Sequence, residues 1–186
     1  MMKSITVIFC LASLLIAGCS SNSLTRNDAL RILQKEKLFP RVVDYDLFCG
    51  DPNYAVKVLD AGLENQGYLT VDRTQKLKDI GKPIIHLTGK ADSYLLPTPK
   101  EDQISKIQRI KIADEYLNEI TGVRMSASGK NAVVEYTVIC KNISPFAVLI
   151  KRDLRKPDDR RAYFSFYDDG WRIEKKPGVE FIEFER

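Results

Sequence analysis

The first 19 residues constrain the chain most, because they separate a targeting segment from the part that has to fold. Lys3 is the only charged residue in this stretch, and a mostly apolar run covers residues 5–15. Such a run has the length of a signal-peptide core and is shorter than the roughly 20 apolar residues that span a bilayer. The small residues Ala17 and Gly18 then precede Cys19 directly. We therefore expect residues 1–18 to be a targeting segment and not part of the folded domain.

The motif Ile16-Ala17-Gly18-Cys19 resembles the lipobox of bacterial lipoprotein precursors. The resemblance implies cleavage after Gly18, a thioether-linked diacylglycerol on Cys19, and N-acylation by a fatty acid such as palmitate. Several acyl chains hold a soluble domain firmly on a membrane, and residues 19–24 would form the lipidated tether. In this family Ser20, which is not Asp, implies sorting to the outer membrane of the cell envelope, facing the periplasm. The alternative is an ordinary secretory signal with a coincidental cysteine.

The overall charge argues against nucleic acid as a partner. The chain has 29 basic and 25 acidic residues, and this balance gives no electrostatic basis for binding a polyanion. With 44% hydrophobic and 29% charged residues, the composition is that of a globular protein. The length suits one ordinary domain or two small ones.

Two cysteines remain once Cys10 leaves with the signal segment and Cys19 carries lipid. Cys49 and Cys140 both lie on the apolar faces of alternating, strand-like segments. In an oxidising compartment two remaining cysteines predict one disulfide. The alternative is two separate buried thiols, since cysteine packs well as a small apolar residue.

The first half of the chain, residues 25–88, predicts a small helix-strand unit. Thr25 and Asp51 are typical helix N-caps, and Gly67 is a typical residue at a helix C-terminus. The sequence Val58-Leu59-Asp60-Ala61-Gly62-Leu63-Glu64-Asn65-Gln66-Gly67-Tyr68-Leu69-Thr70-Val71 resembles the recognition helix and first wing strand of winged-helix domains. The resemblance implies a protein-interaction or spacer module here. The expected elements are helices from Thr25 and over 51–66, and strands at 41–49, 68–73 and 83–88.

The second half, residues 104–186, predicts antiparallel strands, and residues 89–103 read as a linker. The segments 133–141 and 162–172, ending in Tyr-Asp-Asp-Gly-Trp-Arg, resemble the last strands of small cystatin-like or NTF2-like lipoprotein domains. The resemblance implies a curved antiparallel sheet that ends in a hairpin around Asp168-Asp169-Gly170. The expected fold class is therefore α+β, a helix-strand unit followed by a curved antiparallel sheet. Strands are expected at 108–112, 122–125, 132–141, 161–167 and 171–175, and residues 145–150 fit either a strand or a short helix.

Candidate chemistry is sparse. His86 is the only histidine, no Gly-x-Ser-x-Gly nucleophile elbow is present, and no partner for His86 can be named from the sequence. Asp44, Asp46 and Asp51 do not form a calcium loop, because Phe48 stands where the next ligand is required. We expect no catalytic residue, no metal and no cofactor.

A charged run over residues 151–161 is the most unusual surface element. Arg155, Lys156, Arg160 and Arg161 are candidates for contact with an anionic surface. The alternative is a solvated loop that keeps a sheet edge soluble.

These observations favour a non-enzymatic envelope lipoprotein that acts as a protein-binding or scaffolding module, held to the membrane by its lipid anchor. One alternative is a periplasmic carrier of a small ligand or lipid on the concave face of the C-terminal sheet. A further alternative is a hydrolase that uses His86.

Overall fold

The computed structural model describes residues 23–36 and 38–184, and it confirms the α+β class. Within these residues, five antiparallel strands form one strongly curled sheet in the order β1-β4-β5-β6-β7, and β2 pairs with β3 in a separate hairpin. The strands are β1 (Arg41–Phe48), β2 (Leu69–Val71), β3 (Ile85–Leu87), β4 (Ile107–Met125), β5 (Asn131–Lys141), β6 (Asp158–Tyr167) and β7 (Gly170–Glu174).

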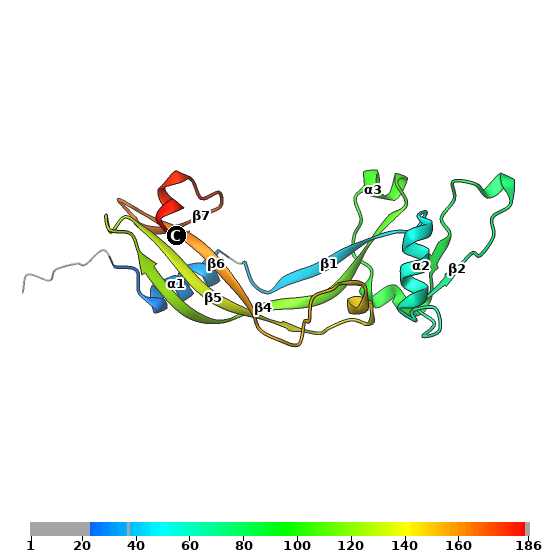
Figure 1. Ribbon diagram of the computed structural model, residues 1–186, viewed down its shortest axis with the longest axis horizontal. Helices are drawn as coiled ribbons and strands as arrows, with labels where there is room; N and C mark the ends of the chain where they lie inside the picture. The colour runs from blue at the N-terminus through cyan, green and yellow to red at the C-terminus, as the bar shows by residue number, and fades with distance from the viewer. Residues whose placement is uncertain (1–22, 37, 185–186) are drawn as a thin grey trace, which may run out of the picture.

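The long strand β4 gives the molecule its length and its curvature (Figure 1). The sequence predicted two short strands here, whereas the structure has one continuous strand of 19 residues. Its pairing with β5 shifts register twice, between Leu117 and Glu119 and between Ile120 and Gly122. Such bulges raise the local twist and bend a sheet, so they explain why this one curls. Gly122 fits the bend because a Cβ atom there would lie 3.0 Å from Oε2 of Glu135.

The helix α1 (Arg26–Lys35) packs on the sheet as its sequence predicts. Thr25 caps it in a capping box: Asp28 N donates to Thr25 Oγ1 at 3.1 Å, and the Asp28 carboxylate accepts from Thr25 N. Ala29 and Leu33 are fully buried in an apolar cluster that also contains residues of β5 and β6. We call this the α1 cluster; its buried members are Leu24, Ala29, Leu33, Ala132, Val134, Tyr136, Val138, Ala162 and Phe164.

The helix α2 (Pro52–Asp60) begins at its predicted cap, since Asn53 N donates to the Asp51 carboxylate at 2.7 Å. It ends at Asp60, six residues earlier than the predicted end at Gln66. Gly62 has φ +71°, so the backbone leaves the helical conformation there and continues as turns. The predicted hairpin that follows is confirmed, because Thr70 lies opposite His86 in the β2–β3 pair.

A second apolar cluster lies around α2 and the β2–β3 hairpin. It includes Val58, Leu69, Ile85 and Ile110, and Phe146 of the 3₁₀ helix η3 (Pro145–Leu149) packs into it. The sequence left residues 145–150 open between strand and helix, and the structure forms a short helix. We call this the α2 cluster.

The predicted division into two units with a linker does not describe the fold. β1 comes from the expected N-terminal unit, yet it pairs along its whole length with β4, from Arg41 opposite Glu115 to Phe48 opposite Ile107. The expected linker at 89–103 contains the 3₁₀ helix η2 (Gly89–Tyr94) and the start of α3 (Lys100–Ile104). Strand pairing across some 70 residues leaves no local signal, so the sequence pattern could not reveal it.

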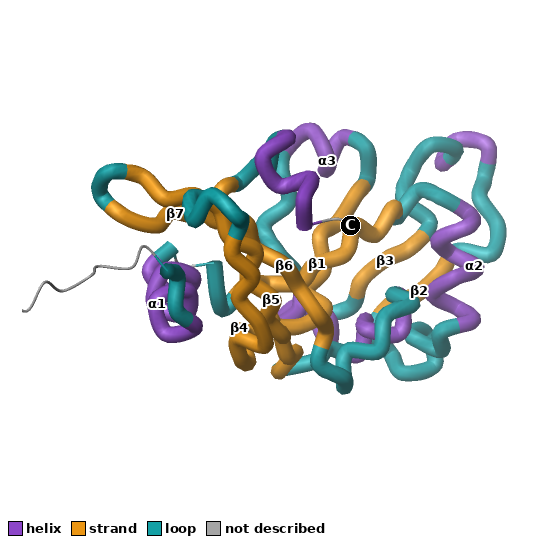
Figure 2. The backbone as a smooth tube through the Cα atoms, turned by 60° about the vertical axis from the view of Figure 1, so that its left-hand side comes forward, coloured by secondary structure: helices purple, strands orange, loops and turns teal. Residues whose placement is uncertain are grey.

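The C-terminal hairpin forms at its predicted turn, where Tyr167 pairs with Gly170 and Gly170 has φ +116°. The chain then crosses to the other face of the sheet, where the 3₁₀ helix η4 (Val179–Phe184) places Phe181 and Phe184 against Val133. Figures 1 and 2 show α1 at one end of an elongated molecule, and α2 with the β2–β3 hairpin at the other.

Candidate functional site

The strand β1 forms one edge of the large sheet and is the candidate binding site. It pairs with β4 on one side only, so its outer backbone groups face away from the sheet. An edge of this kind can accept a strand from another chain. Val42 is exposed, whereas Leu47 is fully buried in the α2 cluster. The edge is therefore accessible along its first half and fixed by packing at its end.

Charged side chains hold β1 against its neighbour. Arg109 of β4 donates through Nε to Oδ2 of Asp44 at 2.9 Å, and Asp46 lies 3.8 Å from the same nitrogen. The hydrogen bond with Asp44 raises the pKa of the Arg109 guanidinium. Both aspartates of β1 thus pair with Arg109 of the neighbouring strand, which accounts for their alternation in the sequence.

A buried carboxylate gives the second support. Glu115 of β4 is 1% exposed and accepts hydrogen bonds from Arg41 at 2.6 Å, Arg152 at 3.0 Å and Arg160 at 3.4 Å. Its neighbours Ala113 and Leu117 pack in the α2 and α1 clusters respectively. Glu115 therefore sits between the two apolar clusters, where arginine side chains from β1, from β6 and from the loop after η3 converge on β4.

A second carboxylate, Asp158, completes this cluster. It lies 3.2 Å from Nε of Arg152 and 2.5 Å from a terminal nitrogen of Arg160. Burial opposes the charge of Arg152, but the hydrogen bond to Glu115 and the charge of Asp158 raise its pKa overall. Each of the three arginines is paired with at least one of the two acids, so the cluster joins β1, β4, β6 and the loop after η3. We call Arg41, Glu115, Arg152, Asp158 and Arg160 the arginine cluster.

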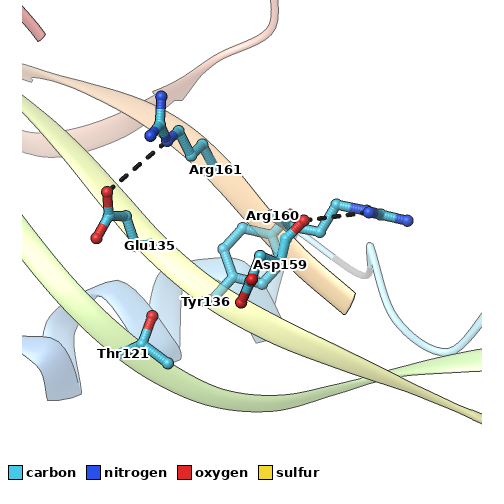
Figure 3. Close-up of a pocket in the computed structure, with 6 residues that line it drawn as sticks. All are labelled: Thr121, Glu135, Tyr136, Asp159, Arg160 and Arg161. Atoms are coloured by element: carbon cyan, nitrogen blue, oxygen red, sulfur yellow. Dashed lines mark hydrogen bonds and ion pairs between the residues drawn. The ribbon is translucent and has the colours of Figure 1, made fainter. Parts of the chain in front are cut away.

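A groove of about 580 Å³ lies beside this cluster, across β4, β5 and β6 (Figure 3). Its wall is mostly charged or polar and holds two acids and two arginines. Arg161 lies 3.7 Å from Glu135, while the Arg160 side chain extends away from that pair. Pockets that hold lipids are mostly apolar, and this groove has a different character. Its lining residues are Thr121, Glu135, Tyr136, Asp159, Arg160 and Arg161.

The four basic residues predicted to contact an anionic surface do not converge. Arg160 lies in the arginine cluster, and Arg161 projects from the opposite face of β6 because successive strand residues alternate. Arg155 and Lys156 lie in the exposed loop before β6, where Lys156 is 3.8 Å from Asp153. The structure thus divides the run between two faces of a strand and a separate loop.

The predicted disulfide is wrong, because Cys49 and Cys140 are both free thiols. Cys49 N donates to the carbonyl of Lys106, whereas Cys140 lies opposite Glu115. Ile107, which lies opposite Phe48, and Glu115 are eight positions apart along β4, which corresponds to about 26 Å of extended strand. A disulfide requires Cα atoms within about 7 Å. Burial raises the pKa of the Cys49 thiol to about 11.

His86 has a partner that the sequence could not identify. Its Nε2 lies 2.9 Å from Oδ2 of Asp72, the residue that follows β2. In the described part of the chain His86 forms no hydrogen bond to a serine, threonine or cysteine side chain. Over the same residues, no group of three potential metal ligands forms.

A projecting loop at the α2 end carries two exposed apolar side chains, one of which, Leu77, is the most exposed large apolar side chain of the described residues. The segment between β2 and β3 contains the 3₁₀ helix η1 (Leu77–Asp79); Leu77 is 87% exposed and Ile80 is 67% exposed. Lys76 and Lys78 flank Leu77. We call these four residues the tip surface. The sequence analysis missed it, although two large apolar residues interleaved with lysines between short strands were a usable signal.

The lipobox and Cys19 lie outside the described residues. Across residues 23–36 and 38–184, no helix has the length and apolar character needed to cross a bilayer. Comparison of the chain with models of protein families, with curated proteins and with solved structures finds no match.

Proposed function

We propose that this protein is a non-enzymatic lipoprotein of the bacterial envelope, anchored through Cys19 to the outer membrane and facing the periplasm. It acts as a scaffolding module that binds an envelope protein along the β1 edge. The observation that carries this proposal is a strand edge, open on its outer side, in the middle of an elongated sheet.

The anchor and the fold are compatible in their dimensions. Leu24 is buried in the α1 cluster, so the chain is fixed to the fold from that residue onward. Five residues lead from Cys19 to Leu24, and they span at most about 17 Å. A lipidated Cys19 would therefore keep the α1 end close to the membrane, and the β1 edge would be displayed beside it.

The support behind β1 favours binding by strand addition. An edge strand can template a partner only if its own backbone is held in place, and the arginine cluster and the Arg109–Asp44 pair do this. Backbone hydrogen bonds would supply affinity, and exposed side chains such as Val42 would supply specificity.

Site-specific photo-crosslinking in intact envelopes tests the proposal. A photoreactive residue at Val42 should yield a discrete crosslinked protein, whereas the same residue at Val148, which is also exposed, should not. A Cys19→Ser variant should lose lipid labelling and leave the membrane fraction. Equal crosslinking at both positions, or membrane association that does not depend on Cys19, would contradict the proposal. A small molecule that co-purifies with the protein would favour the carrier alternative.

A further inference from the structure

The tip surface is built to present its apolar side chains together. A 3₁₀ helix has three residues per turn, so residues three positions apart lie on the same side. Leu77 begins η1 and Ile80 follows its last residue, which places both side chains on one side of the turn. In Figure 1 this loop forms the extremity of the molecule beyond the β2–β3 hairpin.

Hydrogen bonds within the loop hold this arrangement. Gln75 Nε2 donates to the carbonyl oxygens of Asp79 at 3.3 Å and Lys82 at 3.2 Å, and Lys82 Nζ lies 2.7 Å from an Asp79 carboxylate oxygen. At the base of the loop, His86 contacts Asp72. The polar groups of the loop thus bond to one another, and the two apolar side chains point outward.

The charge of the tip surface identifies its partner. Asp79 is paired with Lys82, whereas Lys76 and Lys78 form no ion pair with the described residues. At the same end, Lys106 Nζ lies 3.8 Å from the position of a Cβ on Gly81. Two outward apolar side chains among uncompensated lysines match a lipid surface, since the apolar groups enter the headgroup region and the lysines attract anionic lipids.

A second apolar projection lies at the same end. Ile104, the last residue of α3, is 80% exposed, and Figure 1 shows α3 on the same side of this end as the tip loop. Lys106, which reaches Gly81 of the loop, follows Ile104 by two residues. Apolar and basic side chains therefore recur across this end, opposite the end that α1 occupies.

We propose that the tip surface is a second membrane contact, which inserts Leu77 and Ile80 among the anionic headgroups of the bilayer that holds the Cys19 anchor. The inference rests on the proposed anchoring. A lipid anchor at one end converts a weak contact at the other end into an intramolecular one, so a small surface suffices. The protein then lies along the membrane, with the β1 edge between its two attachment points.

Fluorescence quenching of the lipidated full-length protein in vesicles tests this inference. A tryptophan replaces Ile80 in a Trp171→Phe background, because Trp171 is the only native tryptophan. Two kinds of vesicle are compared, both with brominated acyl chains as quenchers. The mixed, anionic vesicles contain phosphatidylcholine and phosphatidylglycerol in a two-to-one ratio, and the neutral vesicles contain phosphatidylcholine alone. We expect quenching of the introduced tryptophan in the mixed vesicles and much less in the neutral ones. A tryptophan at Val56, exposed on α2, should remain unquenched.

Two variants in the same reporter separate the charge and apolar contributions. Lys76→Gln with Lys78→Gln should shift the ratio of inserted to free tip by about 30-fold toward the free state, and Leu77→Ser should also weaken insertion. Lys151→Gln with Lys156→Gln, a matched change in an exposed loop, should have no effect. Equal effects of the two lysine pairs would overturn the inference.

Further arms distinguish the failures. In one arm the protein is anchored in vesicles without bromine, and separate vesicles with brominated lipid are added. Quenching only by the added vesicles would place the tip surface on a second, apposed bilayer and refute its contact with the bilayer that holds the anchor. If the protein floats with vesicles but the introduced tryptophan is not quenched, the tip contact is refuted and the anchor stands. A protein that crosslinks to a photoreactive residue at position 77 would then be the partner of the tip surface. Failure of the native protein to float with vesicles would refute the anchoring itself.

Discussion

Replacing Glu115 with glutamine removes one negative charge from the arginine cluster and keeps the shape of the side chain. The carboxylate is 1% exposed; one oxygen accepts from Arg41, and the other accepts from Arg152 and Arg160. Glutamine keeps only one acceptor oxygen and turns an NH2 donor toward the guanidinium groups at the other position. Removing one partner of a fully buried ion pair costs about 3–5 kcal/mol.

The expected cost here is lower, because the arginines have access to water. The Arg152 and Arg160 side chains are each 30% exposed, Arg41 is 58% exposed, and Asp158 continues to balance part of their charge. We therefore expect Glu115→Gln to lower the free energy of unfolding by about 2 kcal/mol. For a chain of this length that corresponds to a decrease in Tm of about 4–8 °C.

Urea titration and thermal unfolding followed by circular dichroism measure this loss. Glu119→Gln is the matched control, since Glu119 lies exposed on the same strand, and it should change stability by less than about 0.5 kcal/mol. Equal stability of Glu115→Gln and Glu119→Gln would show that the arginine cluster does not hold β1 to the sheet. A double-mutant cycle with Arg160→Gln should show non-additive losses if the two groups interact.

Three other predictions address the thiols, the pH dependence and the α2 cluster. When the unreduced protein is denatured and treated with an alkylating reagent, mass spectrometry should find both Cys49 and Cys140 alkylated. In the folded protein Cys140 should react first, because Cys49 is buried. Two unalkylated cysteines and a mass lower by two hydrogens would instead reveal a disulfide. Hydrogen bonds from Lys111 and Asn142 lower the pKa of Asp114 below 3.8, so the stability that Asp114 contributes is present above that pH and is lost as the pH falls through the lower pKa of the folded state. Asp114→Asn should therefore lower the free energy of unfolding at pH 7 and make it decline less steeply in acid. Parallel curves of unfolding free energy against pH for the two proteins would refute this. Phe146→Ala should lower the free energy of unfolding by about 3–5 kcal/mol, while Val148→Ala on the same 3₁₀ helix should be neutral, and similar losses would contradict the packing.

Several elements could be predicted because their signals are local. The cap at Thr25, the Asp51-Pro52 helix start and the Asp168-Asp169-Gly170 hairpin depend on residues within four positions of one another. Helix α2 shows the limit of this approach, since an apolar stripe continued past Asp60 but Gly62 ended the helix.

The candidate site could not be predicted in the same way. Glu115 receives its partners from β1, from the loop after η3 and from β6, and no spacing in the sequence relates these three segments. An acidic residue between the apolar positions Ala113 and Leu117 was a usable signal that this strand held a buried charge. The Cys49–Cys140 pairing failed for a related reason, because both residues do lie on strands but at different levels of the sheet.

By itself the sequence determined the α+β class, the N-terminal helix caps, the C-terminal hairpin turn and a lipobox-like motif at Cys19, because these depend on neighbouring residues and on alternation along one strand. The tertiary structure decided that β1 joins β4, that three arginines share Glu115, that the thiols stay apart and that Leu77 and Ile80 face outward. These outcomes depend on which strands pair and in which register. That choice minimises the free energy of the whole sheet, and it leaves no mark within any one segment.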